Sequence, residues 1–111
     1  MDLNEFQKNA EASIFYMGGN DIDSKVYCAM GLAEEAGEVV GKVKKLYRDR
    51  NGKIDEEWRE LVGNELGDTL WYLAMLASRV GLTLEEVALM NIEKRKRRHA
   101  ANTLRGDGDQ R

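Results

Sequence analysis

Residues 65–77 read Glu65-Leu66-Gly67-Asp68-Thr69-Leu70-Trp71-Tyr72-Leu73-Ala74-Met75-Leu76-Ala77, and the rest of the chain is best understood from them. From residue 69 onward they are almost all apolar, which predicts a buried helix. At about 100° per residue, Glu65 and Asp68 project to one side of this helix, one turn apart, together with Tyr72. Lone carboxylates are expensive to bury among apolar side chains. A metal ion is therefore the best candidate to balance these two acids.

A second acidic stretch lies upstream at residues 31–42, Gly31-Leu32-Ala33-Glu34-Glu35-Ala36-Gly37-Glu38-Val39-Val40-Gly41-Lys42. Within it, Glu35 and Glu38 repeat the three-residue spacing and share one face of a helix. Two helices packed together could pool four carboxylates, those of Glu35, Glu38, Glu65 and Asp68. Such a cluster repels itself unless a cation lies within it, and oxygen ligands suit Mg²⁺, Mn²⁺ or Ca²⁺. The alternative is two ordinary amphipathic helices with acids on their solvated edges.

The composition favours a single domain spanning residues 1–111. Charged residues make up 33% of the chain and the net charge is -3, which argues against a general polyanion binder. The lone Cys28 excludes a disulfide framework within the chain and is interpreted as a packing residue. No signal-peptide pattern and no apolar run of membrane-spanning length is found. We therefore expect a cytoplasmic protein without a membrane partner.

The periodicity predicts an all-α fold, a four-helix bundle with a polar C-terminal tail. The expected helices cover residues 3–15, 25–47, 56–79 and 84–98. Their expected N-caps are Asp2, Ser24, Asp55 and Thr83. Asn51-Gly52 and Gly81 are turn and stop signals, and residues 100–111 are interpreted as an extended tail. The third helix is apolar on most of its sides, more than a small monomer can cover, so we also expect a homo-oligomer.

Two glycine pairs occur inside the predicted helices next to the acids, Gly37 with Gly41 and Gly63 with Gly67. Each glycine within a helix costs about 0.5–1 kcal/mol relative to alanine. A close approach of the two helix backbones would explain this cost. We therefore expect the two acid-bearing helices to contact each other at these glycines.

The pattern Glu34-Glu35-x-x-Glu38 followed by Glu65-x-x-Asp68, with its flanks at residues 31–39 and 65–74, resembles the MazG-type nucleoside triphosphate pyrophosphohydrolases. Residues 91–94, Asn91-Ile92-Glu93-Lys94, and the closing residues 106–111 strengthen the resemblance, which covers nearly the whole chain. It implies Mg²⁺-dependent hydrolysis of (deoxy)nucleoside triphosphates to monophosphate and pyrophosphate, with Mn²⁺ as a possible substitute, as house-cleaning of the nucleotide pool. The metal ligands it implies are Glu35, Glu38, Glu65 and Asp68. It also implies a homodimer or a dimer-of-dimers tetramer, with sites near subunit contacts.

Substrate contacts are expected around the acids. Lys42 and Lys45 lie one and two turns beyond Glu38, where phosphates could reach them, although Lys42 could instead form an ion pair with Glu38. Glu34 could orient the attacking water or act as general base, which makes Glu34, Glu35 and Glu38 the candidate catalytic residues. Tyr72 could stack on a base, and core packing is the alternative.

The basic run 94–98, Lys94-Arg95-Lys96-Arg97-Arg98, allows three interpretations. It could complement the dipole at a helix C-terminus, bind nucleic acid, or supply phosphate contacts from Lys94 together with Asn91, as the resemblance implies. The acidic total and the absence of interleaved aromatic residues argue against nucleic acid. A metal role for the neighbouring His99 is not expected.

Two other classes of function compete with the pyrophosphohydrolase. One is a non-catalytic helical interaction or regulatory module, whose acids only fill a polar seam. The other is a di-iron carboxylate bundle, but that site needs Glu-x-x-His pairs, and His99 is the single histidine. The chain also lacks the Gly-x-x-x-x-Gly-Lys loop of γ-phosphate hydrolases.

Overall fold

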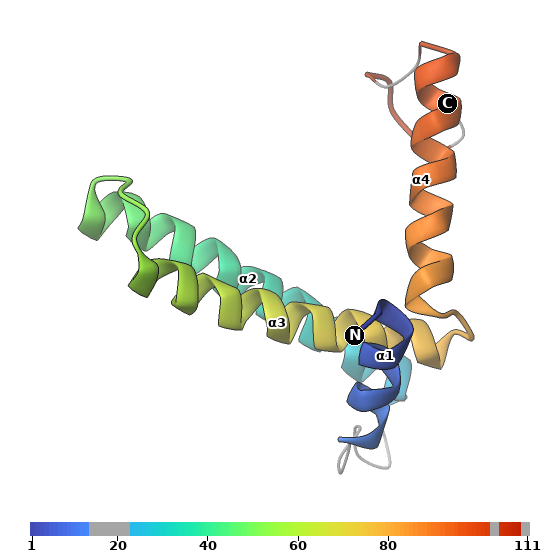
Figure 1. Ribbon diagram of the computed structural model, residues 1–111, viewed down its shortest axis with the longest axis horizontal. Helices are drawn as coiled ribbons and strands as arrows, with labels where there is room; N and C mark the ends of the chain where they lie inside the picture. Colours follow the sequence, from blue (N-terminus) through green and yellow to red (C-terminus); the bar gives the residue numbers. More distant parts are fainter. Residues whose placement is uncertain (14–22, 103–104, 110–111) are drawn as a thin grey trace.

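The computed structural model describes residues 1–13, 23–102 and 105–109. Its helices are α1 (Leu3–Ala12), α2 (Ser24–Arg50), α3 (Glu56–Arg79) and α4 (Leu84–Ala100), and the described residues contain no strand. The predicted all-α class and its four helices are therefore confirmed. The long helices α2 and α3 lie side by side as an antiparallel hairpin, and α1 packs near the end where α3 finishes (Figure 1). From that end α4 projects away from the hairpin (Figure 1).

Local capping chemistry explains where the helices begin. The Asp55 carboxylate accepts from the Trp58 backbone N–H at the start of α3, and Thr83 forms a capping box with Glu86 at the start of α4, both as predicted. The predicted Ser24 cap is wrong by one residue. Asp23 is the N-cap of α2, and its carboxylate accepts from the Lys25 N–H at 2.8 Å.

Three helix ends differ from the predicted ones. Helix α1 ends at Ala12 rather than at residue 15, a position outside the described residues. Helix α2 continues three residues past the predicted end, because the left-handed conformation that stops it falls at Asn51, with φ 53°. Helix α4 reaches Ala100, and Gly81 lies in the turn before it with φ 79°.

The hydrophobic core lies where α1, α3 and the start of α4 meet the beginning of α2, and its buried members are Ala10, Cys28, Ala74, Met75, Ala77 and Leu84. Cys28 is fully buried there, so its interpretation as a packing residue is confirmed. Gln7, which sequence reasoning missed, is also buried. Its Nε2 donates to Ser78 Oγ at 2.8 Å, and its Oε1 accepts from the Leu84 N–H at 2.9 Å. This one side chain therefore ties α1 to both sides of the α3–α4 turn.

The prediction that α2 and α3 contact each other at the two glycine pairs is wrong. The four glycines of these pairs are Gly37, Gly41, Gly63 and Gly67. A Cβ added at any of them would meet no described heavy atom within 4 Å outside its own helix. The close approach occurs instead at Gly31, where a Cβ would overlap the ring of Tyr72. Side chains, including an indole N–H that Trp58 donates to the Lys42 carbonyl at 2.9 Å, hold α2 and α3 together near the acids.

The described part of the C-terminal segment turns back on α4 instead of extending away, which corrects the predicted extended tail. The Asp109 carboxylate lies 3.2 Å from Lys94 Nζ and 3.1 Å from Arg98 Nη2. Arg98 also donates to the Gly108 carbonyl and is buried. Among the described helices, none combines the length and the apolar character needed to cross a membrane.

Candidate metal centre

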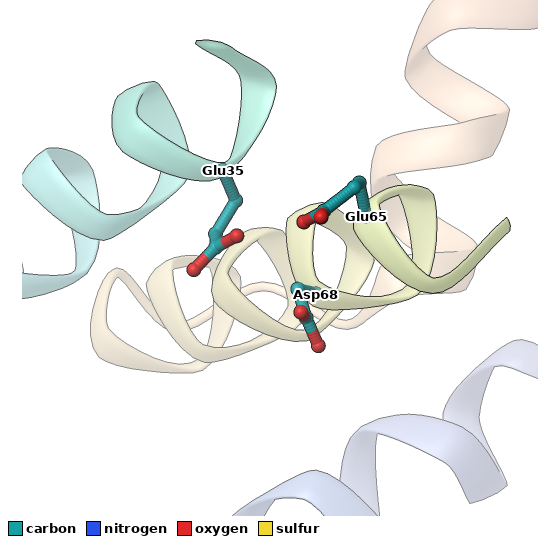
Figure 2. A group of neighbouring side chains, drawn as sticks. All are labelled: Glu35, Glu65 and Asp68. Atoms are coloured by element: carbon teal, nitrogen blue, oxygen red, sulfur yellow. The ribbon is translucent and has the colours of Figure 1, made fainter. Parts of the chain in front are cut away.

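Three carboxylates from two helices converge on one point of the hairpin. Glu35 comes from α2, and Glu65 and Asp68 come from α3 (Figure 2). One oxygen from each residue lies within 4.8 Å of the other two. The three-residue spacing on α3 places its two acids on one helix face, and packing against α2 brings the third acid to them.

The charges around this acid cluster are only partly balanced. Lys42 Nζ lies 3.5 Å from Glu65 Oε1, and both side chains are largely covered, with 23% and 19% of their areas exposed. The ion-pair partner of Lys42 is therefore Glu65, not the Glu38 that spacing alone suggested as an alternative. Partial burial and the nearby charges of Asp68 and Glu65 raise the pKa of Glu35. Three carboxylates facing one ammonium leave an excess of negative charge that suits a divalent cation.

The donor set fits a hard cation. Opposite ligands of an octahedral Mg²⁺ with bonds of about 2.1 Å lie about 4.2 Å apart. The widest separation among the three oxygens is within 4.8 Å, so small side-chain rotations would reach that geometry. Carboxylate oxygens favour Mg²⁺ or Mn²⁺ over the softer metals that take sulfur and imidazole ligands. Asp68 is exposed, which leaves one side of the cluster open to a substrate.

The other two predicted catalytic acids lie beside the cluster. Glu38 follows Glu35 by one turn of α2 and is exposed, and among the described residues it is not part of the group of converging oxygens. Its charge still contributes to raising the pKa of Glu35. Glu34 is exposed as well and lines a separate hollow with Tyr72.

The predicted basic residues fall into two groups. Lys42 and Lys45 line a hollow of about 570 Å³ on the hairpin, next to the cluster. Asn91 and Lys94 line a groove of about 690 Å³ on α4. Within the described chain α4 packs against α1 and α3 but not against α2. Within a single chain, Lys42 and Lys45 therefore lie near the acid cluster. Asn91 and Lys94 lie on α4, which projects away from the hairpin (Figure 1).

Tyr72 belongs to an aromatic hollow of about 240 Å³ between α2 and α3, lined by Tyr27, Met30, Gly31, Glu34 and Tyr72. The Tyr72 ring lies 6.4 Å from that of Tyr27, centroid to centroid, and meets the Trp71 ring edge-on at 5.0 Å. Burial and the Tyr27 hydroxyl raise the pKa of Tyr72, so its phenol is neutral at physiological pH. Sequence reasoning missed Tyr27 and Gly31. The signal that could have found Gly31 is its place one turn before Glu35.

Comparisons with known proteins agree with the all-α fold. The sequence model of the MazG nucleotide pyrophosphohydrolase domain matches residues 25–102, which include all three clustered acids. The chain therefore belongs to the MazG nucleotide pyrophosphohydrolase family. It is 39% identical to the Gene 37 protein of Mycobacterium phage L5 over 114 residues, and the match covers the full length of both chains. No solved structure matches it significantly.

Proposed function

We propose that this protein hydrolyses (deoxy)nucleoside triphosphates to the monophosphate and pyrophosphate, with Mg²⁺ as its metal and Mn²⁺ as a possible substitute, in house-cleaning of the nucleotide pool. The observation that carries the proposal is the convergence of Glu35, Glu65 and Asp68 within 4.8 Å, in a chain of the MazG family. When bound, Mg²⁺ would neutralise phosphate charge and lower the pKa of a nearby water. The three carboxylates would hold the ion and fix its position between α2 and α3.

The remaining predicted residues have complementary roles in this proposal. Lys42 and Lys45 would bind the phosphates that leave as pyrophosphate, because they extend from the cluster along α2. Glu38 would complete the ligand set by rotating toward Glu35, one turn away. Glu34 would orient the attacking water or accept its proton. The role of Glu38 can be tested with Glu38→Gln, which should lower the affinity for Mg²⁺ if Glu38 is a metal ligand and leave it unchanged if it is not.

The bond that breaks can be identified by isotope labelling. Water is proposed to attack the α-phosphorus, and hydrolysis in ¹⁸O-labelled water should then place the label in the nucleoside monophosphate. Label in the pyrophosphate would indicate attack at the β-phosphorus. Release of diphosphate and orthophosphate would contradict the proposed activity.

A homo-oligomer, a homodimer or a dimer-of-dimers tetramer, is part of the same proposal. Large apolar side chains are exposed on three helices, with 66% of Val40 on α2, 52% of Leu66 on α3 and 60% of Met90 on α4 open to solvent. Burial of such surface against a second copy would be favourable at roughly 25 cal/mol per Å². A second copy would also offer a route by which Asn91 and Lys94 on α4 reach an acid cluster.

Sedimentation at micromolar concentration should therefore give a multiple of the 12.6 kDa chain mass. Met90→Glu should shift the distribution toward the monomer, because it would bury a charge in the contact. Lys96→Gln on the same helix changes the charge by the same amount at an exposed position outside the α4 groove, and it serves as the control. A monomer at these concentrations would contradict the expectation.

A further inference from the structure

The described C-terminal residues 105–109, which we call the C-terminal latch, lie beside the last turns of α4 (Figure 1). One oxygen of Asp109, Oδ1, lies 3.2 Å from Lys94 Nζ and 3.1 Å from Arg98 Nη2. Arg98 also donates to the Gly108 carbonyl at 3.1 Å. The hydrogen bonds from Lys94 and Arg98 lower the pKa of Asp109, so its carboxylate is charged at neutral pH. The latch is therefore bound to α4 through its last two residues.

The cations beside the latch form a group on one face of α4. Lys94, Arg97 and Arg98 are three and four residues apart, which places them on neighbouring turns of one helix face. Lys94 and Arg97 line the α4 groove together with Asp109. The other acid of this groove, Glu93, has a lysine partner of its own on α4. Three cations facing one carboxylate favour an anion that carries more charge than Asp109 does.

The attachment of the latch is of a kind that an anion can reverse. All five of its residues are exposed, and it contains no apolar side chain whose burial would favour attachment. The Asp109 side chain is 77% exposed, and ion pairs of exposed groups are weak and screened by salt. The latch can therefore leave α4 without disturbing the hydrophobic core.

Arg98, in contrast, is covered, with 10% of its side chain exposed. Taking a guanidinium out of water is costly unless an acceptor stays with it. Departure of the latch would take both the Asp109 carboxylate and the Gly108 carbonyl away from Arg98. A phosphate offers more oxygens than a carboxylate and matches the fork of a guanidinium. Exchange of one anion for another is therefore favoured over simple opening.

We propose that the C-terminal latch is displaced by the triphosphate chain of the nucleotide, which takes the cations of α4 from Asp109. This inference rests on the proposed nucleotide substrate, and it adds a step to binding, because the carboxylate leaves as the phosphates arrive. Until then Asp109 keeps Lys94 and Arg98 paired. The chain thus carries its own competitor, and removal of that competitor should improve binding of the phosphate chain.

Calorimetry with inorganic tripolyphosphate in metal-free buffer measures this competition without a cation at the acid cluster. Asp109→Asn should bind tripolyphosphate at least about threefold more tightly than the wild type, the scale expected when two ion pairs no longer compete. Asp107→Asn is the matched control, because it makes the same charge change within the latch and Asp107 forms no ion pair with a described residue. It should bind nearly as the wild type does. Adding Lys94→Gln to Asp109→Asn should abolish the gain, which assigns the gain to α4.

Gly108→Ala weakens the latch without changing a charge. Gly108 has φ 81°, a conformation that is unfavourable for alanine, and a Cβ there would meet no described atom within 4 Å. This variant should also bind tripolyphosphate more tightly than the wild type. In ¹H–¹⁵N spectra of the wild type, tripolyphosphate should move the Gly108 amide signal toward its position in Asp109→Asn, because both changes release the latch.

Three results would each overturn the latch. They are equal binding by Asp109→Asn and Asp107→Asn, unchanged binding by Gly108→Ala, and a Gly108 signal that stays in place at the highest tripolyphosphate concentration. If the competition holds but the wild type releases no pyrophosphate from nucleotides, the proposed hydrolysis fails and the latch stands. If pyrophosphate is released but Asp109→Asn binds as Asp107→Asn does, the hydrolysis stands and the latch fails.

Discussion

Asp68→Asn and Glu65→Gln are each expected to lower pyrophosphate release by more than about a hundredfold. Both changes remove a charge from the acid cluster while keeping nearly the same side-chain shape. Mutation of a residue that only orients a metal ligand typically lowers metal affinity or activity 10–100-fold. Loss of a ligand itself should therefore lower the activity by more than this. Pyrophosphate release from a panel of canonical and modified triphosphates is the measurement, and it would also reveal the preferred base.

The matched control for these two variants is Glu60→Gln. Glu60 is an exposed acid on the same helix, outside the converging group, so the change in net charge is the same. Its turnover should stay within about twofold of the wild type, and all three variants should keep the helical circular dichroism. A wild-type rate in Asp68→Asn would exclude the cluster as the catalytic centre.

Millimolar Mg²⁺ is expected to raise the melting temperature of the wild type by on the order of 10 °C. A ligand at 100 times its Kd that binds only the folded state adds about 2.7 kcal/mol, and for a domain of this size each kcal/mol corresponds to several degrees. The physical cause is relief of the repulsion among Glu35, Glu65 and Asp68, which Lys42 balances only in part. Scanning calorimetry with and without the metal measures the shift.

Asp68→Asn provides a second test of the predicted stabilisation by Mg²⁺. Without metal it should melt higher than the wild type, because one of the mutually repelling charges is gone, and it should respond little to Mg²⁺. Glu60→Gln should respond as the wild type does. If the wild type shows no shift with or without nucleotide, the acids form a polar seam, and the non-catalytic interaction module becomes the better interpretation.

Much of the fold and part of the site followed from local rules. A run of apolar residues with 3.6-residue periodicity predicts a helix wherever it occurs, and Asp55, Thr83 and Gly81 mark helix ends through contacts within a few residues. The spacing of Glu65 and Asp68 places both on one helix face for the same reason. These features needed only the geometry of a single helix, so they were predicted with nearly correct boundaries.

The errors near helix ends arose from competition between neighbouring residues. Ser24 and Asp23 are both good N-caps, and only the folded backbone shows that the Asp23 carboxylate accepts a hydrogen bond from the Lys25 N–H.

The error about the glycine pairs has a different cause. These pairs suggested close packing of α2 and α3 beside the acids, but the close contact lies at Gly31. A residue's distance from another helix depends on the rotation of both helices, which the local sequence does not specify.

The sequence by itself therefore determined the four helices, the family pattern and the pairing of acids within each helix. Only the tertiary structure decided that Glu35 rather than Glu38 meets the acids of α3, that Lys42 pairs with Glu65, and that the described C-terminal residues fold back onto α4. The physical reason is that positions along one helix follow from its fixed rise and turn. Contacts between helices depend on their rotation and axial register, and these are set by packing of the whole core, including the buried Gln7 that links α1 to the α3–α4 turn.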